Sequence, residues 1–276
     1  MSKLVSLLRS DLHRTVRSRW PWAVLAFIAL ATLGSAVLTI WWPLDPGVVY
    51  DGLTGRSGAL RLAGRGTNIE LVVMLAPFLA AYLSTADSDT GFDRTLLSSL
   101  RGRVVYFVEK CLFVALLAGM VLLAYLLFSG MGVLVTMRPV VNVEPLWQVV
   151  AWAGDAWLIG CAYALVALLV GQLTRSRALA LSVAFLLLSS ALEQGFFTFL
   201  LLVSDVLGLG WDSALEAAFA WMPYVSLASV QQGAAAMLAV DSTGVAPALR
   251  ALVVCVPLCL GLTSIAAVAG SRRDLA

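Results

Sequence analysis

The chain has 276 residues, of which 61% are hydrophobic and 12% are charged, and its formal net charge is +2. Because a soluble domain carries about 25% charged residues, this composition excludes an ordinary soluble protein. The small net charge says little by itself, because the placement of the charges matters more than their sum. We expect no nucleic-acid partner. About 20 apolar residues suffice to cross the hydrocarbon core of a membrane as a helix, and the sequence contains six such runs.

These runs predict an all-α polytopic membrane protein in which residues 1–276 form a single transmembrane domain. The backbone must satisfy its own hydrogen bonds in lipid, so each run is predicted to be a helix. The six predicted spans are 21–42, 69–86, 111–136, 147–172, 178–203 and 251–270.

Residues 1–20 are predicted to form an elbow helix that lies in the membrane interface. Four apolar residues recur at every fourth position: Leu4, Leu8, Leu12 and Val16. Basic residues occupy other faces: Lys3, Arg9, Arg14 and Arg17. This pattern favours an apolar face in the lipid and a basic face toward anionic headgroups. A simpler alternative is an anchor that only orients the first span.

Residues 87–103, between the second and third spans, are predicted to form a short amphipathic helix. Asp89 or Thr90 can cap its N-terminus, and Gly102 can end it. Three residues give it an apolar face: Phe92, Leu96 and Leu97. Such a helix suits a groove on a partner protein, although the same residues could equally form a solvated connection.

The later spans contain two carboxylates, Asp155 and Glu193, at similar predicted depths below the outer surface. Carboxylates inside a membrane are costly and often functional, so the two residues are candidates for a substrate path. The alternative is that they are protonated or hydrogen-bonded to neighbouring spans. Residues 204–248 are predicted to form short helices at the outer surface, broken at Pro223. The four cysteines lie in apolar runs and have no metal-ligand spacing, so we expect no metal site.

The distribution of Lys and Arg predicts that both ends of the chain are cytoplasmic. With six spans, thirteen of the eighteen basic residues fall on the side that holds the two ends, and five fall on the other side. Cytoplasmic segments carry the excess of Lys and Arg. We expect the protein to lie in the plasma membrane of a bacterium, where its spans contact membrane lipid.

Residues 87–110 resemble the signature of the ABC-type-2 export permease family. The family has an acidic residue after the second span, then a glycine, a leucine pair, an arginine, an aromatic residue and a lysine. The matching residues here are Asp87 or Asp89, Gly91, Leu96, Leu97, Arg103, Tyr106 and Lys110. Phe92 stands where threonine is common, and the family's usual proline is absent. The elbow helix, six spans and an apolar outer segment also resemble this family.

The resemblance implies a permease dimer, homomeric or heteromeric, that works with two copies of a cytoplasmic ABC ATPase subunit. It implies that residues 87–103 form a coupling helix whose apolar anchors are Phe92, Leu96 and Leu97. The charged rim of that helix would be Asp87, Asp89, Arg94, Arg101 and Arg103. The sequence contains no G-x-x-x-x-G-K-[ST] motif, so ATP and Mg would be bound by the partner chain and no cofactor by this one.

The leading hypothesis is therefore the membrane-spanning permease subunit of an ATP-driven exporter, without enzymatic activity of its own. The alternative is an ion- or proton-coupled secondary transporter that uses Asp155 and Glu193, although no internal repeat between spans 1–3 and 4–6 supports it. An intramembrane enzyme would need a nucleophile and a base, or metal ligands, at membrane depth. The single histidine, His13, and the scattered cysteines do not provide such a set.

Overall fold

The chain folds into helices, and no strand occurs in the residues that the structure describes. The computed structural model describes residues 2–41, 73, 75–83, 100–137, 144–174, 176–188, 191–208, 210–211, 213–215, 233–240 and 244–272. The helices are α1 (Ser2–Arg17), α2 (Arg19–Trp41), α6 (Leu100–Thr136), α7 (Leu146–Thr174), α8 (Arg177–Leu188), α9 (Ala191–Leu207), α12 (Ala234–Leu238) and α13 (Pro247–Arg272). Residues 75–83 are also helical. The predicted all-α class is confirmed.

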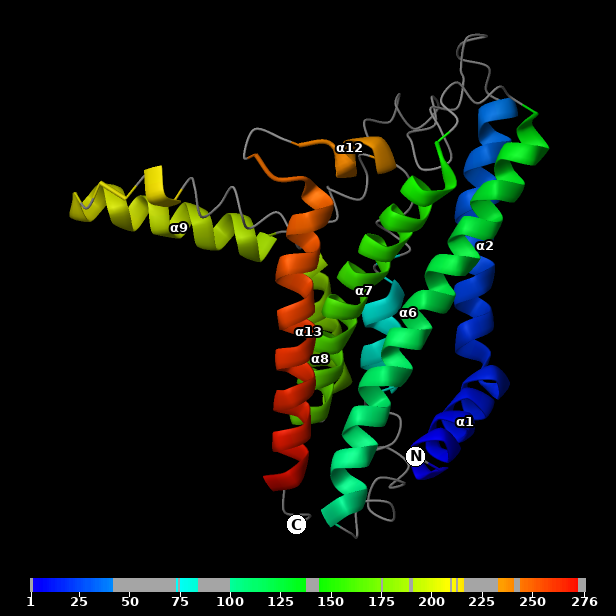
Figure 1. The fold of residues 1–276 in the computed structure, drawn as a ribbon, viewed down its shortest axis with the longest axis horizontal. Coiled ribbons are helices and arrows are strands. Elements are labelled where there is room, and N and C mark those ends of the chain that lie inside the picture. The colour runs from blue at the N-terminus through cyan, green and yellow to red at the C-terminus, as the bar shows by residue number, and fades with distance from the viewer. Residues whose placement is uncertain are drawn as a thin grey trace.

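Among the residues that the structure describes, four helices are long and apolar enough to cross a membrane, judged by length and composition. Their apolar segments are Arg19–Val37, Val104–Thr136, Leu146–Thr174 and Pro247–Ala269. They coincide with the predicted spans 21–42, 111–136, 147–172 and 251–270. The four helices run side by side, and α1 lies at the same end of this bundle as the C-terminal end of α13 (Figure 1). The length and composition of these four helices are thus those of membrane-spanning helices.

The predicted span 178–203 differs from the structure, which divides this segment between α8 and α9. At 1.5 Å per residue, the 12 residues of α8 extend over only about 18 Å. Figure 1 shows α9 running across the direction of α13 and away from the bundle. The sequence around the division combines Ser189 and Ser190 with Gly195. Serine side chains compete for backbone hydrogen bonds and glycine weakens a helix, so this stretch is a poor centre for one continuous span.

The predicted span 69–86 is helical where it is described, at residues 73 and 75–83, and the rest of it lies outside the described residues. The prediction that Gly102 ends a separate helix is wrong, because Gly102 lies inside α6. One glycine costs a helix about 1 kcal/mol, which a helix of 37 residues tolerates. The total of six spans stays a prediction.

The bundle packs around α7, which contacts α6, α8, α12 and α13. Trp152 of α7 is only 1% exposed and belongs to an apolar cluster with residues of α2, α6, α12 and α13. Small residues allow the close approach of neighbouring helices, as is common in membrane bundles. A Cβ atom added at Gly160 would lie 3.6 Å from Val73 Cγ1 and 3.9 Å from Ala118 Cβ. The α2–α6 crossing is tighter, since a Cβ at Gly132 would lie 3.1 Å from Ala36 Cβ.

Candidate functional site

Most of the predicted coupling helix lies outside the described residues. This applies to Asp87, Asp89, Gly91, Phe92, Arg94, Leu96 and Leu97. Arg101 and Arg103 belong to the first turn of α6. The two described ends of this loop are the helix over residues 75–83 and the beginning of α6 at Leu100. Two described contacts border the loop, one at Tyr82 and one at Lys110.

Aromatic and basic side chains surround the end of the helix over residues 75–83. The ring of Tyr82 lies 5.2 Å from the ring of Trp20, centroid to centroid, at an interplanar angle of 47°. The guanidinium carbon of Arg177 lies 4.8 Å from the centroid of the Tyr82 ring. Such cation–π contacts attract the cation to the ring face. The first boundary of the loop is therefore held against the beginnings of α2 and α8.

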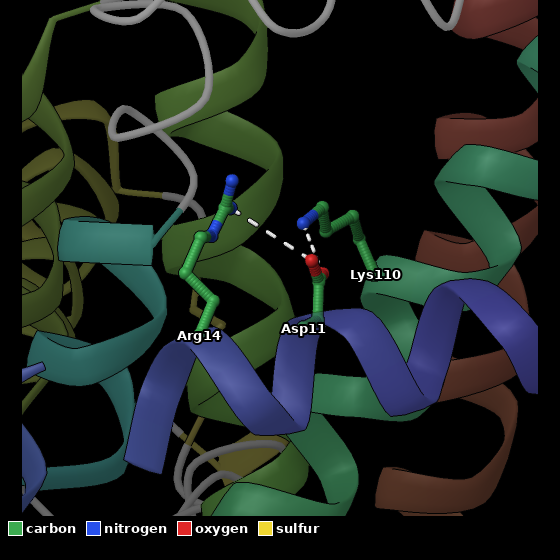
Figure 2. A network of polar contacts seen from close by, with 3 residues as sticks. All are labelled: Asp11, Arg14 and Lys110. Atoms are coloured by element: carbon green, nitrogen blue, oxygen red, sulfur yellow. Dashed lines mark hydrogen bonds and ion pairs between the residues drawn. The ribbon is translucent and has the colours of Figure 1, made fainter. Parts of the chain in front are cut away.

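A buried ion pair joins α1 to α6, ten residues after the second boundary of the loop. Lys110 Nζ donates a hydrogen bond to Asp11 Oδ2 (Figure 2), and the side chains of Lys110 and Asp11 are 5% and 9% exposed. Arg14, whose side chain is 44% exposed, places its Nη2 atom 3.8 Å from Asp11 Oδ1. Lys110 Nζ also lies 5.2 Å from the centroid of the Tyr106 ring.

The local sequence explains why each charge of this pair needs the other. On a helical projection, Asp11 falls between the apolar positions Leu4 and Leu7. Lys110 lies inside the apolar segment Val104–Thr136 of α6. A charge removed from water is costly unless a partner of opposite charge satisfies it. The pair makes both burials tolerable.

Sequence analysis missed the role of Asp11, and it treated Lys110 only as a motif position. The available signal was an acidic residue on the apolar face of a basic helix, together with a lysine inside an apolar run. Sequence reasoning also did not single out Glu109 and Arg250, which are 1% and 5% exposed. The structure places Arg250, buried, in the first turn of α13.

The two carboxylates of the predicted substrate path lie on helices of different direction. Asp155 is buried on α7, on the same side of the helix as Trp152 and Ile159. Glu193 is the third residue of α9, the helix that leaves the bundle, and its side chain lies outside the described residues. The predicted arrangement of the two residues in adjacent continuous spans therefore differs from the structure. Asp155 alone has a described, buried position in the bundle.

The four cysteines are free thiols, with Cys111, Cys161 and Cys255 buried and Cys259 half-buried. They pack within the apolar clusters of the bundle. Across the described part of the chain, no group of three or more His, Cys, Asp or Glu side chains is placed to hold a metal ion.

Comparison with models of known protein families gives no match, and comparison with curated proteins gives no match either.

Proposed function

We propose that the chain is the membrane-spanning permease subunit of an ATP-driven ABC exporter. The observation that carries this proposal is the order of residues over 87–110, from Asp87 or Asp89 to Lys110, between two apolar segments. Four long apolar helices support a membrane-embedded subunit. In this proposal the protein lies in the plasma membrane of a bacterium, and the excess of basic residues near both chain ends places those ends in the cytoplasm.

The proposed mechanism assigns ATP hydrolysis to a separate subunit, because the sequence has no phosphate-binding loop of its own. ATP binding would close two ATPase subunits on the cytoplasmic side of a permease dimer. The coupling helix would then move as a rigid body and shift the spans between inward-open and outward-open states. ATP must bind the two states with different affinities for this to happen.

The proposed contact with the ATPase consists of an apolar centre and a charged rim. Phe92, Leu96 and Leu97 would insert into a groove of the ATPase, which is the common way to bind an amphipathic helix. The rim would be formed by Asp87, Asp89, Arg94, Arg101 and Arg103. Supporting this arrangement, Tyr82 at the first described boundary of the loop contacts Trp20 at the beginning of α2, and Lys110 of α6 contacts Asp11 of the basic N-terminal helix α1.

The test is Leu97→Asp, which places a charge at the proposed apolar contact. We expect the tagged wild-type chain to co-purify with a subunit that carries a phosphate-binding loop, and Leu97→Asp to lose that subunit while its own helical content stays unchanged. Ser98→Asp is the matched control, because it adds the same charge to the adjacent position on another side of the helix. Absence of any such ATPase from the wild-type preparation, or equal retention in both variants, would refute the proposal.

One observation favours a second candidate function, an ion- or proton-coupled secondary transporter. Asp155 is buried on the central helix α7, where an ionisable group is often functional. Transport by the purified chain alone, driven by an ion gradient and abolished in Asp155→Asn, would favour this candidate over the ATP-driven exporter.

A further inference from the structure

The face of α1 that meets the bundle is polar at its centre. Asp11 is 7% exposed and Thr15 is 8% exposed, whereas three apolar residues of the same helix point outward. These are Val5 (61% exposed), Leu12 (40%) and Val16 (48%). If apolar burial alone held α1 in place, these three side chains would face the protein. Leu4, Leu7 and Leu8 are half-buried beside Asp11, so the contact of α1 with the bundle combines apolar side chains with the buried Asp11–Lys110 ion pair.

The connection between α1 and α2 is a single residue, and Trp22 Nε1 of α2 donates a hydrogen bond across it to the carbonyl oxygen of Val16 at 2.8 Å. The two helices are separated at Ser18, whose N–H donates to the carbonyl oxygens of Arg14 and Thr15, each at 3.0 Å. The chain bends there, so α1 is not a straight extension of α2 (Figure 1). An exposed apolar stripe beside basic residues also suits a helix that lies in a lipid interface without touching α6. Breaking the ion pair would make that undocked position available.

Lys110 lies in the same continuous helix as Leu100, so it would move together with the end of the loop that precedes α6. Ten residues separate Leu100, where α6 begins, from Lys110, which corresponds to about 15 Å of continuous helix. A displacement of the first turn of α6 therefore reaches Lys110 without passing through a flexible segment. Because Lys110 is bonded to Asp11, it reaches α1 as well.

We propose that the Asp11–Lys110 ion pair is a latch that makes α1 and the first part of α6 move as one rigid body. Asp11 and Lys110 are positioning residues in this proposal. The docking of α1 is a property of the chain by itself. The transmission of movement to α1 rests on the proposed function, because it needs an ATPase that displaces residues 87–103.

The first experiment measures docking in the purified chain in lipid nanodiscs. Nitroxide labels at Ser10 of α1 and at Leu127 of α6, both exposed, report the distance between the two helices in a background without native cysteines. The wild type should give one narrow distance distribution. The double variant Asp11→Asn/Lys110→Met leaves no buried charge unpaired within the pair, so it should fold yet lose the narrow peak. A narrow peak in the double variant would overturn the latch.

Two controls separate undocking from misfolding. The distance between labels at Leu30 of α2 and Leu127 of α6 should stay narrow in every variant, because those helices pack directly on each other. Arg14→Met removes a charge from the partly exposed side of the same network and should leave the Ser10–Leu127 peak unchanged. Loss of that peak in Arg14→Met would show that the buried pair is not the decisive contact.

The second experiment uses the complex with the ATPase that co-purifies with the wild type. Adding ATP and Mg should change the distance from Ser10 to a label at Leu173, near the end of α7, while the Ser10–Leu127 distance stays constant. In Asp11→Asn/Lys110→Met the ATP-dependent change at Ser10 should be lost. A change in the wild-type Ser10–Leu127 distance on addition of ATP would refute the rigid body. If no ATPase co-purifies, the proposed function fails, and the nanodisc experiment still decides whether the pair docks α1.

Discussion

The crossing of α2 and α6 allows a sharp test of the packing, because two glycines of one helix differ in their surroundings. A Cβ atom at Gly132 would lie 3.1 Å from Ala36 Cβ, whereas a Cβ at Gly130 would have no neighbour within 4 Å. Carbon atoms attract best at about 3.5–4.0 Å, so Gly132→Ala forces the two helices or their side chains apart by roughly half an ångström. Gly130→Ala changes the helix without this strain.

The expected magnitudes follow from two opposing terms. Replacing glycine by alanine inside a helix is favourable by about 1 kcal/mol, and this gain applies to both positions. Overpacking costs about 1–3 kcal/mol, and this cost applies only at Gly132. We therefore expect the free energy of unfolding of Gly132→Ala to be about 1–3 kcal/mol lower than that of Gly130→Ala.

The assay is equilibrium unfolding in mixed micelles, followed by tryptophan fluorescence and circular dichroism. Adding Ala36→Gly to the Gly132→Ala variant removes the close contact, so the two substitutions should be strongly non-additive in a double-mutant cycle. Equal stability of Gly130→Ala and Gly132→Ala, together with an additive cycle, would refute this account of the α2–α6 crossing.

Two further predictions concern α7. Trp152→Ala should lower the free energy of unfolding by about 3–5 kcal/mol, because it empties a site that is 1% exposed, whereas Trp147→Ala, at a position that is 62% exposed, should cost much less in the same denaturation assay. Asp155→Asn should fold with unchanged or higher stability and keep ATP-driven transport, because asparagine preserves the shape of the buried side chain and removes its charge. Loss of transport in a normally folded Asp155→Asn variant would instead place Asp155 in the substrate path.

Three helices, α1, α2 and α7, could be predicted from sequence because the pattern that indicates each of them lies within the helix itself. α2 and α7 are long apolar runs, and a run of this length in lipid must close its hydrogen bonds within itself. The amphipathic helix α1 was predicted from periodicity alone. The division of residues 178–203 into α8 and α9 could not be predicted in this way. An apolar run indicates a helix, but its hydropathy does not show where the helix changes direction.

The contact between Asp11 and Lys110 in the candidate site could not be predicted from sequence either. The motif residues over 87–110 could be read in order along the chain, and the structure describes the last of them, Lys110, in its contact with Asp11. These two residues are 99 positions apart. No local pattern links Asp11 to Lys110, because the pairing depends on how α1 folds back against α6.

Hydropathy and periodicity, which are local properties, determined that this chain forms helices suited to a membrane. Local spacing also identified the segment between the second and third apolar runs as the most informative polar stretch. Only the tertiary structure decided which charges are buried, which of them meet, and which apolar faces stay exposed. The physical reason is that the cost of burying Asp11 or Lys110 is offset by a partner from a different helix, and partners are chosen by packing in three dimensions.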